Sequence, residues 1–150
     1  MKSAYLVTDR ETDMEILKKL LPSELAQHLT LYAAHGKYSA RSAAGTLLSD
    51  RMRPVALVLD ADTENQSEIQ EKIELTNTML YPASSPEVPF KVFLAVPSIA
   101  SILPLSNLHS AELIDILDRL TPTQIQTLQQ HPLIQQLVNF LSNVTQQIAS

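Results

Sequence analysis

Three acidic side chains follow a short apolar run in the middle of the chain. The run at residues 55–59 ends in Asp60, Asp62 and Glu64. Carboxylate oxygens are the ligands that hard cations such as Mg²⁺ prefer, and carboxylates held this close repel one another unless a cation balances them. The alternative is a solvated turn, because turns favour Asp. The pattern therefore predicts a metal site if further acidic residues reach the same place.

A second acidic pair lies near the N-terminus, where Asp9 ends another apolar run and Asp13 follows four residues later. Together the two segments supply up to five carboxylates, whose mutual repulsion calls for cations. Two Mg²⁺ or Mn²⁺ ions about 4 Å apart can clamp a phosphodiester during in-line attack. Asp13 alone also fits a helix N-terminus, where negative charge is favourable.

The elements that would position these residues are strands joined by helices. Apolar runs at residues 4–8, 29–33, 55–59 and 90–96 have the length of strands, and helical patterns separate them. Helical crossovers make neighbouring strands parallel. The sequence thus predicts an α/β, Rossmann-like domain with a mainly parallel four-stranded sheet flanked by helices. Ligands bind such sheets at the carboxyl ends of the strands.

Helix starts give a second set of expectations. Thr12 and Glu15 match a capping box, which predicts a helix that starts after Thr12. Thr121 and Gln124 match another, with a proline between them at the first helical position. A third helix is expected from Glu68. The last part of the chain is helical throughout, so we expect an α/β domain over residues 1–105 and a helical C-terminal extension over residues 106–150, packed on or beside it.

Composition excludes several kinds of site. The 150 residues include no Cys, which excludes disulfides and thiolate chemistry, and the 2 Gly cannot form a glycine-rich phosphate loop. The net charge of −5 disfavours strong nucleic-acid binding by the isolated chain. The apolar run near the start is too short for a signal peptide, and no segment has the length of a membrane span. We expect a cytoplasmic protein without membrane contact.

The acidic segments resemble the motifs of the Toprim domain, which topoisomerases, bacterial primases and overcoming-lysogenization-defect nucleases share. Asp9-Arg-Glu-Thr-Asp13 is similar to the first motif, His35-Gly-Lys37 to the glycine turn after the second strand, and Asp60-Ala-Asp-Thr-Glu64 to the D-x-D-x-E motif. The similarity covers residues 4–103. This chain has Asp9 where the family usually has Glu, and Arg10 where Gly is usual.

The resemblance implies roles for individual residues. Asp9, Asp60 and Asp62 would be the catalytic, metal-binding acids, with Asp13 and Glu64 as further metal ligands. Among the basic residues of the first third, Arg10, Lys37 and Arg41 are candidates for contacts with the nucleic-acid backbone. For Lys37 and Arg41 a solvated helix start is an equal explanation.

Three functions follow from these residues. The first is a Toprim-like protein that binds Mg²⁺ or Mn²⁺ and acts on phosphodiesters of DNA or RNA, as a nuclease that works with a protein partner, either an ATPase subunit or a second copy. The second is a non-catalytic Toprim-like interaction or regulatory module with a degenerate site. The third is a receiver-like phospho-acceptor domain, which also gathers acids at strand ends but needs a Lys after a later strand.

Overall fold

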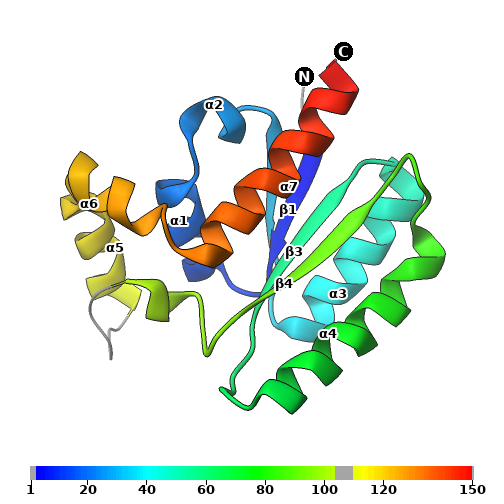
Figure 1. Cartoon of the computed structure of the whole chain (residues 1–150), viewed down its shortest axis with the longest axis horizontal. Helices are drawn as coiled ribbons and strands as arrows, with labels where there is room; N and C mark the ends of the chain where they lie inside the picture. The colour runs from blue at the N-terminus through cyan, green and yellow to red at the C-terminus, as the bar shows by residue number, and fades with distance from the viewer. Residues whose placement is uncertain (1–2, 104–109, 150) are drawn as a thin grey trace.

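The computed structural model describes residues 3–103 and 110–149. Its centre is a four-stranded sheet in the order β2-β1-β3-β4, with every neighbouring pair parallel. The strands are β1 (Ala4–Thr8), β2 (Leu29–Ala33), β3 (Val55–Asp60) and β4 (Phe90–Ala95). Helices flank the sheet and continue into the C-terminal part (Figure 1), so the predicted α/β, Rossmann-like class is confirmed.

Helices connect the strands and form the C-terminal part of the chain.

None of the helices in the two described ranges has both the length and the apolar character that crossing a membrane requires. The helices, including one π turn and two 3₁₀ turns, are α1 (Glu11–Leu20), α2 (Ser23–Ala26), α3 (Lys37–Thr46), η1 (Leu47–Arg51), α4 (Gln66–Leu80), η2 (Tyr81–Ala83), η3 (Ala100–Ile102), α5 (Ser110–Arg119), α6 (Pro122–Leu128) and α7 (Pro132–Ala149).

Both faces of the sheet are covered (Figure 1). On one face, residues of α1 and α7 cluster with Leu6 and Val58 of the strands. On the other face, residues of α3 and α4 cluster with Val7 and Leu57. Successive side chains of a strand point to opposite faces, so a strand covered on both sides is apolar at every position. This is why β3 is buried at all six positions and shows no polar alternation.

The first helix starts earlier than its capping pattern predicts. α1 begins at Glu11, its N-cap is Arg10, and no side chain caps it, so the capping box at Thr12 and Glu15 is wrong. Asp13 therefore lies inside the first turn of α1, with its side chain buried. The early start decides where the Asp13 carboxylate points.

The other two helix starts depend on side-chain caps. The capping box of Thr121 and Gln124 is present at the start of α6 and is confirmed. At α4 the Asn65 side chain accepts a hydrogen bond from the Glu68 amide, 3.1 Å away. Because Asn65 is the cap, α4 begins at Gln66, two residues before the predicted start.

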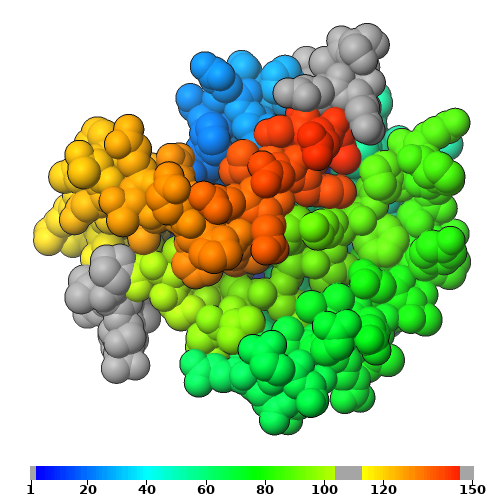
Figure 2. Space-filling view, in the orientation of Figure 1, coloured from blue at the N-terminus to red at the C-terminus, as the bar shows by residue number. Residues whose placement is uncertain are grey.

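α7 contributes a large share of the hydrophobic core. Ile134, Leu137 and Leu141 are fully buried and belong to the same cluster as Leu6 and Val58. Figure 2 shows α7, in orange to red, lying across the front of the molecule. The predicted boundary at residues 105 and 106 lies outside the described residues. The buried face of α7 nevertheless shows that this helix and the strands share one core.

A substitution in α7 tests this shared core. Leu137→Ala should lower the free energy of unfolding by about 2–5 kcal/mol, because it removes buried methyl groups and leaves a cavity. Leu75→Ala, the same change at a side chain that is 59 % exposed on α4, should change it by less than about 0.5 kcal/mol. Urea unfolding measures both. Equal effects of the two substitutions would contradict the packing of α7 on the sheet.

Candidate metal centre

Three aspartates meet at the carboxyl edge of the sheet. Asp9 directly follows β1, Asp60 is the last residue of β3, and Asp13 lies in the first turn of α1. One carboxylate oxygen of each lies within 4.8 Å of the other two. The strands explain the meeting, because β1 and β3 are parallel neighbours with Thr8 paired to Val58, so both leave the sheet at the same edge. The three residues are between 1 % and 2 % exposed.

The backbone around the cluster is held by hydrogen bonds between loops. The Gly36 amide donates to the Asp9 carbonyl, 2.8 Å away, and ties the end of β1 to the loop after β2. Gly36 has φ 110°, which a residue with a side chain rarely adopts, and this turn starts α3 at Lys37. On the other side, the Ala61 amide donates to the Ala95 carbonyl at 2.8 Å. These hydrogen bonds therefore fix the backbone on which Asp9 and Asp60 lie.

The hydrogen bonding of the three carboxylates is incomplete. Asp60 Oδ1 accepts a hydrogen bond from the Ile99 amide, 2.7 Å away. Asp9 Oδ1 and Asp13 Oδ2 are buried and accept no hydrogen bond from the described residues. A buried charged oxygen without a partner is costly. Asp13 Oδ2 lies 3.5 Å from Arg10 Nε and is partly compensated by its charge, so Asp9 Oδ1 is the oxygen left with the least compensation.

Two side-chain cations border the cluster. Arg10 donates from Nη2 to Asp60 Oδ2, and its Nε lies 3.5 Å from Asp13 Oδ2. Lys37 Nζ lies 3.4 Å from Asp9 Oδ2. Burial lowers the pKa of Arg10 and of Lys37, but the neighbouring carboxylates more than offset this, and both pKa values are raised. Both side chains therefore stay charged beside the acids.

Crowding of the acids changes their protonation. Burial, followed by the negative charge of Asp60 and a hydrogen bond with Asp9, raises the pKa of Asp13 to about 7. Burial also raises the pKa of Asp60, although the Ile99 amide and Arg10 counteract it. Near neutral pH a proton on Asp13 thus relieves part of the repulsion when no cation is bound.

The residues predicted from the D-x-D-x-E pattern separate in space. Asp60 lies in the cluster, whereas the Asp62 side chain is 57 % exposed and pairs with Lys37 Nζ at 2.5 Å. Glu64 is exposed and lies outside the three-carboxylate group. β3 ends at Asp60, and Asp62 has φ 58°, in the left-handed region. The chain therefore turns away from the sheet after Asp60. In a continuing strand, the side chains of residues 60 and 62 would point to the same face, but the strand ends before Asp62.

The predicted basic residues also differ in position. Arg10 and Lys37 both contact the acids. Arg41 lies one turn further along α3, and its buried Nε makes no hydrogen bond within the described ranges. The Ile99 amide was missed, since a backbone donor has no signature in side-chain types. The four-residue spacing of Asp9 and Asp13 was the signal that could have ranked Asp13 above Asp62.

The spacing of the carboxylates suits a divalent cation. With bonds of about 2.1 Å around Mg²⁺, ligand oxygens lie about 3–4.2 Å apart, and the larger Ca²⁺ spreads them further. The separation of up to 4.8 Å therefore needs only a small contraction around Mg²⁺ or Mn²⁺. The donors are carboxylate oxygens, as hard cations prefer. Asp9, Asp13 and Asp60 could thus hold a metal ion.

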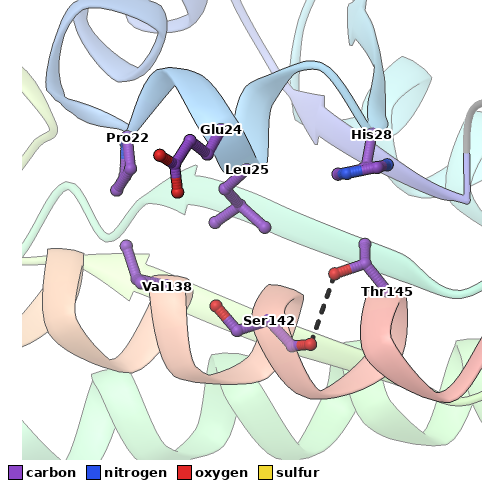
Figure 3. Close-up of a pocket in the computed structure, with 7 residues that line it drawn as sticks. All are labelled: Pro22, Glu24, Leu25, His28, Val138, Ser142 and Thr145. Carbon is purple, nitrogen blue, oxygen red and sulfur yellow. Dashed lines mark hydrogen bonds between the residues drawn. The ribbon is translucent and has the colours of Figure 1, made fainter. Parts of the chain in front are cut away.

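An open pocket elsewhere shares no residue with this cluster. It has a volume of about 300 Å³ and lies between α2 and α7 (Figure 3). His28 and Glu24 line one side of it, while Thr145 on the other side donates to the Ser142 carbonyl at 3.2 Å. No group of three potential metal ligands lies there among the described residues. We therefore place the candidate site at the three aspartates.

Comparisons with known proteins add no assignment. No protein-family model matches the sequence. No curated protein and no solved structure gives a significant match. The Toprim resemblance therefore stays a prediction that rests on the acidic motifs.

The raised pKa of Asp13 predicts a pH dependence of stability. Without divalent ions, stability should fall as the pH rises from about 4 to 7, because the folded protein keeps a proton on Asp13 that the unfolded chain has released. Asp13→Asn needs no such proton. Its gain in stability over the wild type should be about 2 kcal/mol larger at pH 8 than at pH 5.

Urea unfolding in EDTA at the two pH values measures this difference. Asp118→Asn, at an exposed position of α5, serves as the control and should follow the wild type. If Asp13→Asn also followed the wild type, the carboxyl group of Asp13 would be ionised in the folded protein throughout this range.

Proposed function

We propose that this protein binds a divalent cation, Mg²⁺ or Mn²⁺, at Asp9, Asp13 and Asp60 and acts on nucleic-acid phosphodiesters as a nuclease. The observation that carries the proposal is the buried cluster of Asp9, Asp13 and Asp60, in which Asp9 Oδ1 accepts no hydrogen bond from an amide, a hydroxyl or a basic side chain of the described residues. A cation satisfies this oxygen and neutralises the repulsion together, which an uncharged ligand does not.

Each residue of the site has a distinct task in this proposal. When bound, the ion supplies Lewis-acid stabilisation of negative charge on the phosphate. Asp9, Asp13 and Asp60 hold it, and the Ile99 amide fixes the orientation of Asp60. Asp62 lies on the solvent side, paired with Lys37, where a carboxylate can orient an attacking water.

The charge of the chain bears on its partners. With a net charge of −5, the isolated chain repels a long stretch of DNA or RNA backbone. Arg10 and Lys37 provide local positive charge at the site, enough for one or two phosphates. We therefore propose that a partner subunit, an ATPase or a second copy, supplies most of the nucleic-acid surface.

One observation favours a non-catalytic alternative. Arg10 pairs directly with Asp60, so a side chain already neutralises part of the cluster without any ion. In a regulatory module with a degenerate site, this pair would be permanent and no cation would bind. The receiver-like alternative has less support, because the described sheet ends at β4 and offers no fifth strand to carry the required Lys.

Thermal unfolding separates the two leading functions. With about 10 mM Mg²⁺ or 1 mM Mn²⁺, the wild type should unfold at a higher temperature than in EDTA. An ion that binds only the folded state and is present at a concentration of about ten times its Kd adds roughly 1.4 kcal/mol to the free energy of unfolding. Asp60→Asn should lose this shift. Asp50→Asn, an exposed aspartate before the opposite edge of the sheet, should keep it.

Nicking of supercoiled plasmid DNA then tests catalysis. The wild type should nick in the presence of Mn²⁺, alone or with its partner subunit, and Asp60→Asn should reduce the rate at least about 100-fold, since the ion is no longer held in place. The absence of both the metal-induced shift and nicking would favour the non-catalytic module. A metal-induced shift without nicking would support the metal site and contradict the nuclease.

A further inference from the structure

A positively charged side chain, that of Arg10, contacts the acidic cluster directly. In a two-metal site, a second ion bridges the acids and the substrate phosphate. Here the Arg10 guanidinium contacts Asp60 through Nη2 and lies 3.5 Å from Asp13 through Nε. It thus spans two of the three carboxylates that would bind the ion.

We propose that the site takes one divalent cation and that Arg10 occupies the position of the second, binding a phosphate oxygen of the substrate. This inference rests on the proposed function and specifies how its site is built. The first argument is charge. Four carboxylates, those of Asp9, Asp13, Asp60 and Asp62, surround two side-chain cations, Arg10 and Lys37. Fully ionised, they leave two negative charges, which one divalent ion balances and two would exceed.

The second argument is the place of Arg10 between protein and solvent. Its side chain is 56 % exposed, whereas that of Asp60 is 1 % exposed. One side of the guanidinium therefore meets the buried acids and the other side faces outward. A metal ion that bridges protein and substrate has the same two-sided environment.

The third argument is the donor geometry of the guanidinium. Arg10 uses Nη2 and Nε toward the acids. A guanidinium carries five N–H groups in a planar fork, so donors on Nη1 and the second hydrogen of Nη2 remain for a phosphate. Lys37 is less suited to this role, because its ammonium group is already paired with both the buried Asp9 and the exposed Asp62.

Counting bound ions tests the inference without any assay of activity. Titration calorimetry with MnCl₂, checked by the electron paramagnetic resonance signal of free Mn²⁺, should give one ion per wild-type chain. Arg10→Gln should bind two ions, the first at least about fivefold more tightly, because a positive charge beside the ion is gone. Arg10→Lys keeps the charge and should bind one.

Arg51→Gln is the matched control. Arg51 is exposed and precedes β3, so it lies at the opposite edge of the sheet, and this variant should bind one ion with wild-type affinity. Two ions on the wild-type chain would overturn the inference and leave the proposed function standing. A single ion of unchanged affinity on folded Arg10→Gln, with circular dichroism as the test of folding, would also overturn it. Absence of Mn²⁺ binding from every variant would remove the proposed function and this inference with it.

Discussion

Repulsion between buried carboxylates is the constraint on which this structure depends. Asp9, Asp13 and Asp60 are nearly inaccessible to water, yet their oxygens lie within a few ångströms of one another. Bringing three such charges together in a low-dielectric place is unfavourable unless opposite charge, hydrogen bonds or protons compensate. The protein uses all three means, through Arg10 and Lys37, the Ile99 amide, and a proton on Asp13.

The sheet supplies the rigidity that keeps the acids together. β1 and β3 are central strands, and their hydrogen-bonded register sets the separation of Asp9 and Asp60. The hydrophobic clusters on both faces hold these strands in place, and α7 closes one of them. Moving a strand to relieve the repulsion would disrupt buried packing, so the unfavourable electrostatic energy remains at the site. A bound cation would lower this electrostatic energy.

The two side-chain cations give the site an intermediate character. A cluster without them would attract cations strongly, while a cluster fully paired with Arg and Lys would attract none. Here Asp9 Oδ1 lacks a hydrogen-bond donor within the described chain, although Asp9 Oδ2 lies near Lys37. Compensation of the negative charge is therefore partial, and the three aspartates could hold a metal ion.

Local patterns were enough to predict the strands and the parallel sheet. Apolar runs the length of a strand, separated by helical segments, leave little choice of architecture, and strand ends at one edge bring Asp9 toward Asp60. The choice between Asp62 and Asp13 as the third buried acid was decided by the tertiary structure. It depends on where β3 ends, on the left-handed conformation of Asp62 and on the start of α1 at Glu11.

The same holds for the partners of the acids. Arg10 and Lys37 were recognisable as nearby basic residues, but their pairing with particular carboxylates depends on the order of the strands and on the turn at Gly36. The amide of Ile99 comes from a segment 39 residues away from Asp60. The sequence by itself therefore determined which elements form and which acids stand at their ends. Only the tertiary structure decided which oxygens meet, because that depends on backbone angles and strand order, which no local residue pattern encodes.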